Sequence, residues 1–287
     1  MNTKEETPVG NIKNANFPVD ASGTVYHLGC KKEELAQRVL TVGDYERAEK
    51  LSKLLDTDVK IEIRKHRGFV TYTGAYKGVP MSIVSIGMGI PMMDFLVREG
   101  RYVVNGPMAV IRYGTCGSVT NVPVGSLAIA KDSVLIRRNP DYWHPSKPSN
   151  ISPYDISLPC ESDPELFENL RSEFVSQYGE ERIVTGTNAS ADSFYSSQGR
   201  IDPNFDDQND KLIDQLIQTH KNIKTLEMET FQLYHLATRS VAPIKAAAAT
   251  IILANRLSND FLSNEEKTKL EISGGKACLE ALYKQKL

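Results

Sequence analysis

The chain has 287 residues, of which 40% are hydrophobic and 24% charged, a composition typical of a globular protein with a sizeable core. Its 34 basic and 36 acidic residues leave a net charge of −2, which argues against a general nucleic-acid binder. No apolar run reaches the roughly 18 residues of a membrane span, so we expect no membrane partner.

The N-terminal sequence and the cysteines both bear on where the protein is located in the cell. The N-terminus lacks the basic and apolar regions of a signal peptide. The four cysteines are far apart and form no Cys-x-x-Cys pair, so we expect reduced thiols, no zinc site and a cytoplasmic location. Residues 1–22 are polar and predict a flexible arm, followed by one domain over residues 23–287.

The first core strand is predicted at Arg38 to Val42, before a helix that begins near Tyr45. Gly43 lies at the strand-to-helix turn, where backbone N–H groups can point at an anion. Arg47 lies in the first helical turn, where a cation is mildly unfavourable against the helix dipole, which is a modest indication of an anion partner for it. His27, further upstream, is either a contact residue or an ordinary surface histidine.

Two alternating segments, Phe69 to Thr73 and Met81 to Ile86, predict a hairpin. The basic cluster from Arg64 to Arg67 is predicted to be a solvated face at a turn. Gly87 to Pro91 ends a strand and begins a helix to about Val104. The Gly-x-Gly there is weak support for a dinucleotide loop, because the third glycine and the distal acidic residue are missing.

The motif from Arg112 to Gly117 follows the apolar run Met108 to Ile111, which is typical of a buried strand. A buried arginine needs an anionic partner, since leaving it unpaired costs about 3–5 kcal/mol. Gly114 and Gly117 predict a turn in which N–H groups and the Thr115 hydroxyl bind phosphate or a carboxylate. The alternative is an arginine paired with a structural carboxylate beside an ordinary glycine turn.

The next stretch contains a predicted strand pair from Gly125 to Ile136 and then a segment, 137–160, with five prolines. Proline excludes a helix or a central strand there. Such a long irregular loop is a lid, a partner contact or a surface excursion. A helix at about Pro164 to Gln177 and a strand at Arg182 to Thr187 follow.

Two polar groups of residues in the last third are candidates for ligand binding. Gln198 and Arg200 offer donors and an acceptor that suit the edge of a planar heterocycle, and Phe194 could lie against its face. Glu227 and Glu229 flank Met228 at a helix start. These carboxylates either serve the helix dipole or accept hydrogen bonds from vicinal sugar hydroxyls.

An apolar strand at Ala246 to Ala254 and a helix from about Ser263 complete the pattern. Strands alternate with helices, no repeat is visible and no linker divides the chain. We therefore predict an α/β fold, a single domain with helices packed around a mixed, largely buried sheet. Polar groups recur at strand ends, where ligands bind in such folds.

Taken in this order, the segments resemble the nucleoside phosphorylase-I family, and within it the members that cleave pyrimidine nucleosides. The matching motifs run from about Val25 to the C-terminal helix. They are His27-Leu28-Gly29, Gly43 to Arg47, Arg112 to Gly117, Asp192 to Arg200, and Glu227 to Glu229. The Gln-x-Arg block is the most specific, because it looks like the element that recognises uracil.

The resemblance implies a three-layer α/β/α domain with a mixed, partly barrel-like central sheet. It implies phosphorolysis of uridine to uracil and ribose 1-phosphate in pyrimidine salvage, with deoxyuridine and thymidine as further candidate substrates. Inorganic phosphate is then a co-substrate, and no metal or organic cofactor is expected. Donors aimed at the uracil oxygens would stabilise the charge that develops on the leaving base.

The resemblance also assigns roles to individual residues. Phosphate would be bound by Gly43, Arg47, Arg67, Arg112 and Thr115. The ribose would be bound by His27, Glu227, Met228 and Glu229. Uracil would be bound by Phe194, Gln198 and Arg200, and the catalytic residues would be Arg112, Gln198 and Arg200. His27 and Arg67 would come from a neighbouring subunit. The spellings at Gly87 to Pro91, Gln198 to Arg200 and Asn255 to Leu257 look closer to animal-type members, which are commonly dimers rather than hexamers, so a homodimer with active sites completed across the interface is expected.

Several departures and alternatives remain. Gly68 and Met92 stand where bacterial members contribute to a cation site, so no such ion is expected. Tyr113 is bulkier than the usual aliphatic residue and could alter the pocket floor. A purine or methylthioadenosine phosphorylase is disfavoured by Asn255, since those members place an Asp at that strand end. A catalytically silent nucleoside-binding paralogue is the remaining alternative.

Overall fold

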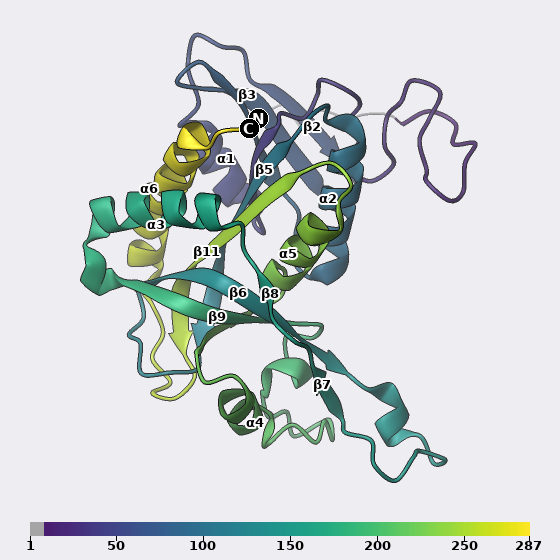
Figure 1. Ribbon diagram of the computed structural model, residues 1–287, viewed down its shortest axis with the longest axis vertical. Helices are drawn as coiled ribbons and strands as arrows, with labels where there is room; N and C mark the ends of the chain where they lie inside the picture. Colours follow the sequence, from purple (N-terminus) through teal and green to yellow (C-terminus); the bar gives the residue numbers. More distant parts are fainter. Residues whose placement is uncertain (1–8) are drawn as a thin grey trace.

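The computed structural model describes residues 9–287 and contains a mixed sheet with helices on both faces (Figure 1). The strands are β1 Arg38–Val42, β2 Glu62–His66, β3 Phe69–Tyr76, β4 Val79–Ser85, β5 Met108–Ser118, β6 Leu127–Arg138, β7 Tyr154–Ile156, β8 Cys160–Glu161, β9 Ile183–Ala191, β10 Ile223–Glu227 and β11 Ile244–Asn255. The helices are α1 Tyr45–Ser52, α2 Ile90–Val103, α3 Pro164–Tyr178, α4 Leu212–Thr219, α5 Thr230–Arg239 and α6 Asn264–Lys284.

Half of the sheet closes into a barrel. The strand order is β10-β9-β6-β11-β5-β1-β4-β3-β2, and β10 pairs again with β5, so β5, β11, β6, β9 and β10 form a closed ring. The closing contact is antiparallel and joins Thr225 to Ser118 and Leu226 to Gly117. On the other side β5 pairs with β1 in parallel, and β1 with β4 in parallel. Closure brings the ends of β5 and β10 together, and both carry predicted site residues.

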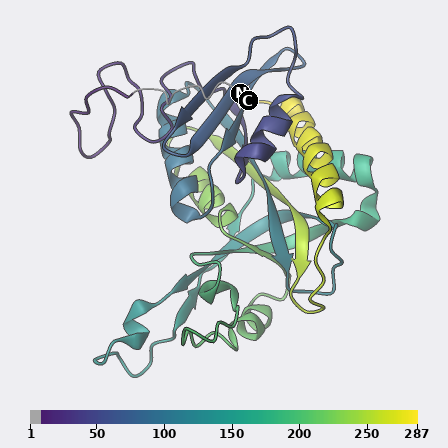
Figure 2. The same cartoon turned by 180° about the vertical axis from the view of Figure 1, so that it is seen from behind.

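Helices cover the sheet on two faces, as Figures 1 and 2 show. One face packs against α1, α3 and α6, with Leu40 and Ile111 in that core. The opposite face packs against α2 and α5, with Val39 and Val110 in that second core. Successive strand residues point to opposite faces, so a strand buried on both is apolar throughout. The predicted three-layer α/β/α architecture with a partly barrel-like sheet is confirmed.

The turn predicted at Gly114 to Gly117 is wrong. β5 continues without a turn to Ser118 and pairs along its length with β11. A Cβ at Gly114 would lie 3.3 Å from the Arg112 guanidinium, so the missing side chain gives that group room. These glycines therefore belong to a strand that a charged side chain crosses closely, which is another reason for glycine within a sheet.

Two further predictions need correction. The predicted strand pair at Gly125 to Ile136 is one long strand, β6. The basic cluster before Phe69 forms the edge strand β2, and Arg64 pairs with Glu34 at 2.9 Å with its side chain 16% exposed. The solvated-face prediction therefore does not hold for Arg64, whereas Lys65 and Arg67 are exposed.

The proline-rich segment forms an arm that projects from the barrel (Figures 1 and 2). It contains a short 3-10 turn at Pro140–Trp143 and the strands β7 and β8, which pair with β6. Tyr154 anchors it, because its hydroxyl donates to Asp207 O at 2.7 Å. The strand β6 extends two residues into the predicted loop, to Arg138, and residues 139–159 contain no α-helix or central strand, as the prolines predict.

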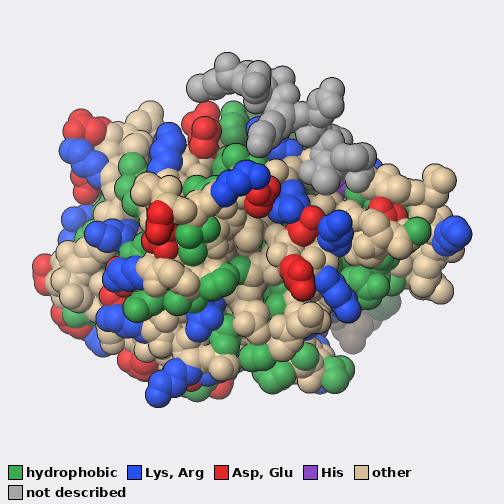
Figure 3. Space-filling view, turned by 90° about the horizontal axis from the view of Figure 1, so that it is seen from above, with side chains coloured by type: hydrophobic (Ala, Val, Ile, Leu, Met, Phe, Trp, Pro, Cys, Tyr) green, Lys and Arg blue, Asp and Glu red, His purple; other side chains and the backbone are tan. Residues whose placement is uncertain are grey.

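The N-terminal segment is described from residue 9 onward, so residues 1–8 of the predicted arm lie outside the described residues. Asp20 organises a turn by accepting hydrogen bonds from the backbone N–H groups of Ser22 and Thr24. Phe17 packs against Tyr102 on α2, with ring centroids 4.8 Å apart. On the face in Figure 3, basic and acidic side chains are intermingled, in line with the near-neutral composition.

Among residues 9–287, each helix is too short or too polar to cross a bilayer.

Tyr113 does not reach the pocket floor. Side chains alternate along a strand, so Arg112 and Tyr113 point to opposite faces of β5. The Tyr113 ring is fully buried against α6, and its hydroxyl donates to Leu270 O at 2.7 Å. A Cβ at Gly274 would lie 2.0 Å from the Tyr113 hydroxyl oxygen. The bulky tyrosine is thus matched by a glycine in the helix above it.

We predict that Gly274→Ala destabilises the protein, although alanine favours a helix interior over glycine by about 1 kcal/mol. The added methyl group overlaps the Tyr113 hydroxyl, and overpacking of this kind costs about 1–3 kcal/mol. A lowered midpoint in thermal or urea unfolding would show this. Lys276→Ala, at an exposed position of the same helix, is the control, and an equal or higher midpoint for Gly274→Ala would contradict the prediction.

Candidate active site

A cavity of about 680 Å³ lies where β1, β5, β10 and β11 end. It is lined by residues that are far apart in sequence, because several strands and helix starts meet there. The lining includes Gly43, Arg47, Arg112, Thr115, Phe194, Gln198, Arg200, Glu227, Met228 and Glu229. The fold thus brings together most of the predicted site residues.

Arg112 and Arg47 form the basic end of the cavity. Arg112 Nη2 donates to Glu229 Oε2 at 2.7 Å, and Arg112 Nη1 donates to Tyr113 O at 3.2 Å. Arg47 donates from Nε and Nη2 to Glu271 Oε1, at 3.0 and 2.9 Å. Both arginines are 5% exposed, so each guanidinium is buried with a carboxylate partner, as such groups require.

Glu271 escaped the sequence analysis. It lies on α6, is 3% exposed, and has Lys50 and Lys267 within 3.8 and 3.7 Å. Its signal in the sequence is a charged residue on the apolar face of a helix, one turn before Gly274. Because Glu271 engages the Nε edge of Arg47, that guanidinium is fixed in orientation, and the two lysines offset the negative charge behind it.

The glycine turn between β1 and α1 leaves no space for a side chain. A Cβ at Gly43 would lie 3.1 Å from Gly87 O and 3.4 Å from Arg112 Nη2. Asp44 caps α1 by accepting a hydrogen bond from Glu46 N at 2.7 Å. The helix therefore begins at the cavity wall, with its N–H groups and positive dipole end beside the arginines.

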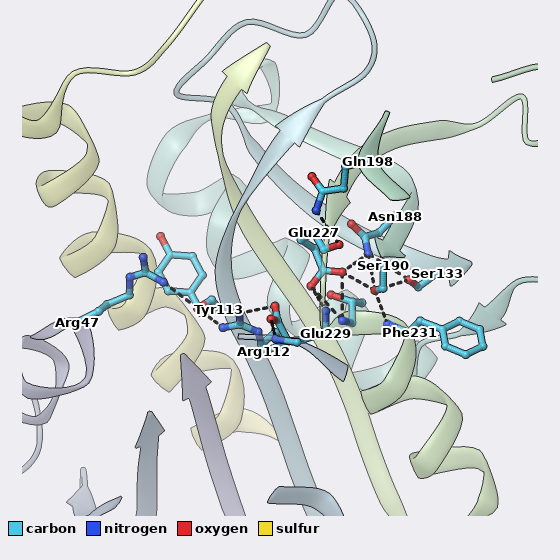
Figure 4. Close-up of polar contacts among 12 residues, drawn as sticks. Arg47, Arg112, Tyr113, Ser133, Asn188, Ser190, Gln198, Glu227, Glu229 and Phe231 are labelled. Atoms are coloured by element: carbon cyan, nitrogen blue, oxygen red, sulfur yellow. Dashed lines mark hydrogen bonds and ion pairs between the residues drawn. The ribbon is translucent and has the colours of Figure 1, made fainter. Parts of the chain in front are cut away.

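Two carboxylates stand at the β10–α5 junction (Figure 4). Glu229 precedes the first residue of α5, and its carboxylate lies between Gly89 N and Arg112. Glu227, at the end of β10, accepts hydrogen bonds from Asn188 Nδ2 at 2.7 Å and from Glu229 N at 2.9 Å. Burial, followed by the charge of Glu229, raises the pKa of Glu227.

The block from Phe194 to Arg200 forms the opposite end of the cavity. Arg200 Nη1 donates to Gln198 Oε1 and to Phe194 O, each at 2.6 Å, and its guanidinium carbon lies 3.7 Å from the centroid of the Phe194 ring. Burial, followed by the charge of Arg256, lowers the pKa of Arg200 to about 10. A flat ring and a row of polar groups thus lie side by side, as a planar heterocycle would need.

Arg256 is a second residue that the sequence analysis missed as part of the site. Its guanidinium donates to Gln198 O at 2.8 Å and to Gly199 O at 3.1 Å, so it ties this loop to the end of β11. Its neighbour Asn255 is committed to the backbone. Asn255 Nδ2 donates to Thr120 O and Val122 O, and Oδ1 accepts from Leu257 N and Ser258 N.

His27 and Arg67 do not line this cavity. His27 Nδ1 lies 2.6 Å from Glu99 Oε1, and the imidazole stacks on Phe95 with ring centroids 3.8 Å apart. Arg67 Nη1 donates to the Tyr26 hydroxyl at 3.0 Å, and the Tyr26 and His27 rings are 5.1 Å apart. The two predicted residues therefore gather in one patch outside the cavity lining, although Gly68, which follows Arg67, belongs to that lining.

The chain is thus an α/β protein whose partly closed barrel carries a basic, carboxylate-lined cavity at its strand ends. The chain belongs to the phosphorylase superfamily, because the model of that family matches residues 37–281. It is similar to a uridine phosphorylase of Thermococcus kodakarensis, with 33% identity over 88% of this chain and 85% of that protein. A DeoD-type purine nucleoside phosphorylase of Buchnera aphidicola is 29% identical over 83% of this chain and 88% of that protein.

One solved structure agrees with this assignment, and a second shares the fold. A structure from a study of two diverse uridine phosphorylases in the oomycete Phytophthora capsici superposes with a TM-score of 0.92 at 41% identity, covering 96% of this chain and 100% of that one. A Trypanosoma brucei nucleoside phosphorylase, described as showing uridine phosphorylase activity, superposes with a TM-score of 0.80 over 94% and 100% of the two chains. At 22% identity the second likeness supports the fold alone.

We predict that Glu271→Met lowers the free energy of unfolding by about 3–5 kcal/mol, because Arg47 is then buried without a counter-charge. The double variant with Arg47→Met should recover most of the loss, since both charges are gone. Urea unfolding followed by circular dichroism measures both.

The control is Glu265→Met, on the same helix. Glu265 pairs with Lys269 at 2.7 Å, but these side chains are 80% and 65% exposed. An exposed pair of this kind contributes at most about 1 kcal/mol. A double variant as unstable as Glu271→Met alone would show that the pair is not the cause.

Proposed function

We propose that this protein cleaves uridine by phosphorolysis, giving uracil and ribose 1-phosphate, and serves pyrimidine salvage in the cytoplasm. The observation that carries the proposal is the joining in one cavity of two buried arginines, a pair of carboxylates and the Gln198–Arg200 block. The relatives named uridine phosphorylase support it. Residues 23–287 would form the catalytic domain, with residues 1–22 as an arm.

Phosphate would bind at the basic end of the cavity. Arg47 and Arg112 supply charge, while the backbone at Gly43 and the Thr115 hydroxyl supply further donors. Arg112 also contacts Glu229, so phosphate and sugar would be held by one connected set of groups. Holding the nucleophile against the sugar makes the attack effectively unimolecular, which is a large part of catalysis in transfer reactions. Phosphate is then a co-substrate, and no cofactor is needed.

The ribose would lie over Met228 and Glu229. An ionised Glu229 accepts hydrogen bonds from sugar hydroxyls, since a carboxylate has no donor of its own. Glu227 would support this arrangement from below. His27 of a second subunit would reach the 5′-hydroxyl.

The base would lie beside Phe194 with its polar edge facing Gln198 and Arg200, because the Arg200 guanidinium itself stacks on the Phe194 ring at 3.7 Å. A phosphate oxygen attacks C1′ while the bond from C1′ to uracil N1 breaks, and the electron pair of that bond moves onto the base. Positive charge develops on the sugar, beside the phosphate anion. Donors from Gln198 and Arg200 would stabilise the negative charge on the uracil oxygens, and one such donor is typically worth about 10²–10³ in rate.

A purine or methylthioadenosine phosphorylase is the second candidate, because a purine nucleoside phosphorylase is among the relatives. Such enzymes are expected to need a side chain that protonates a purine ring nitrogen at the end of β11. Asn255 is there instead, with both ends of its amide bound to backbone groups. This favours a pyrimidine substrate. A silent nucleoside-binding paralogue would bind uridine without turnover.

The first prediction of this proposal is that uridine yields uracil when phosphate is present and not when it is absent. Arg200→Ala should lower kcat/KM for uridine by about 10²–10³, because one donor to the leaving base is lost. The free energy of unfolding should fall by only about 1–3 kcal/mol, from the lost hydrogen bonds to Gln198 and Phe194. Chromatography of the products and urea unfolding measure the two effects.

Arg98→Ala, which removes a 60% exposed arginine from α2, is the control and should leave both quantities unchanged. Uridine left intact in the presence of phosphate would refute the proposal. If the Arg200→Ala variant were so unstable that its unfolded fraction accounted for the whole loss of activity, Arg200 would instead be a structural residue.

We further propose a homodimer in which His27 and Arg67 complete the site of the other subunit. Co-expression of Arg112→Ala with the double variant His27→Ala/Arg67→Ala tests this. Half of randomly paired dimers are hybrids, and one of their two sites has every residue, so about a quarter of wild-type activity should return. If His27 and Arg67 serve their own chain, mixing would restore nothing beyond the sum of the parent variants.

A further inference from the structure

A buried line of polar side chains leads from the barrel to the sugar end of the cavity (Figure 4). It begins at Thr225 on β10, whose hydroxyl donates to Asn188 Oδ1 at 2.9 Å. The Asn188 amide nitrogen then donates to Glu227 Oε1 at 2.7 Å and to Ser133 Oγ at 3.1 Å. These four residues are 0–5% exposed, so the bonds are made away from water, where a lost partner is expensive.

Both carboxylate oxygens of Glu227 accept hydrogen bonds from groups of its own chain. Oε1 accepts from Asn188 Nδ2 and from the Ser190 hydroxyl. Oε2 accepts from Glu229 N at 2.9 Å and from Thr230 N at 3.0 Å. These N–H groups begin α5, so Glu227 acts as a cap for that helix. Its acceptors are therefore committed to backbone and barrel groups, and not to a sugar.

The position of Glu229 depends on the cap that Glu227 forms at the start of α5. Its own N–H is bound by Glu227, and its side chain lies between Gly89 N and Arg112 Nη2. A shift in Glu227 is thus passed to Glu229 through a single backbone hydrogen bond. The amide orientation of Asn188 matters for the same reason, since only its NH₂ end can donate to Glu227, and the Thr225 hydroxyl donates to the Oδ1 at the other end.

We propose that Thr225 and Asn188 are positioning residues that act through Glu227 on Glu229 and set the preference for ribose over 2-deoxyribose. This inference rests on the proposed function, in which Glu229 accepts hydrogen bonds from the ribose hydroxyls. A ribonucleoside offers Glu229 two vicinal hydroxyls, whereas a 2′-deoxynucleoside offers one. Displacement of the carboxylate therefore costs the ribonucleoside more.

The electrostatics of Glu227 agree with this geometry. Burial and the charge of Glu229 raise its pKa, while the hydrogen bonds from Ser190 and Asn188 lower it. Without the Asn188 donor, the protonated form is favoured further. A protonated carboxyl has one oxygen that donates, so it is a poorer acceptor for the two N–H groups at the start of α5.

The test is Thr225→Val, which keeps the shape of the side chain and removes the hydroxyl that orients Asn188. We expect kcat/KM for uridine to fall about tenfold, the typical cost of one hydrogen bond to a charged group, and kcat/KM for deoxyuridine to fall about twofold or less. The ratio of the two substrates then falls about fivefold. Asn188→Leu should lower the ratio at least as far, and Thr225→Val carries the test if that variant does not fold.

Thr73→Val is the matched control, because the Thr73 hydroxyl also makes an internal bond, to Glu34 O at 2.9 Å, but on β3 outside the cavity. Its substrate ratio should equal that of the wild type. Equal losses for both substrates in Thr225→Val, or no loss for either, would overturn the positioning role.

Calorimetry with ribose 1-phosphate and 2-deoxyribose 1-phosphate separates this inference from the proposed function. If the wild type does not cleave uridine, the proposed function fails, while the relative affinity for the two sugar phosphates still reports on Glu229. A preference for ribose 1-phosphate that is lost in Thr225→Val supports positioning. An unchanged preference refutes it.

Discussion

The cavity depends on one buried ion pair, between Arg112 on β5 and Glu229 at the start of α5. The two residues are 117 positions apart, and both side chains are almost fully buried. The pair joins the basic end of the site to the sugar end. Its geometry is fixed on both sides, because Arg112 lies within a strand paired on both edges and Glu229 lies at a capped helix start.

Closure of the barrel is what makes this pair possible. β10 meets β5 through a two-residue antiparallel contact at Thr225 and Leu226, immediately before Glu227. The same strand pairs with β9, which brings Asn188 and Ser190 beneath the carboxylates. The short strand β10 therefore fixes the relative positions of three parts of the site: the end of β5, the end of β9 and the carboxylates that follow β10 itself. An open sheet would leave β10 at an edge, and the start of α5 would lose its direct strand connection to β5, which carries Arg112.

Local patterns in the sequence predicted β1, α1, the β3–β4 hairpin and the apolar β11, since each has its own periodicity or length. The turn predicted from Gly114 and Gly117 is wrong, because glycine is found both in turns and in strands where another side chain passes close to the backbone. Only the pairing of β5 with β11 distinguishes these two cases. The motifs for phosphate, sugar and base were recognisable, and the structure brings all but His27 and Arg67 into one cavity. Glu271 and Asn188 were not predicted, because what matters about them is a partner 224 and 39 positions away.

Stability alone does not explain the charges in this cavity. Arg47 with Glu271 and Arg112 with Glu229 bury four charged groups in one region. Replacement of a buried pair by apolar side chains of similar size is often neutral or stabilising, because the free-energy cost of removing both charges from water can exceed their mutual attraction. Two such pairs side by side therefore point to a ligand that needs oriented charge. In each pair the carboxylate holds one edge of the guanidinium, so the direction of its remaining donors is set before any anion arrives, and that preorganisation is what a transfer reaction with phosphate requires.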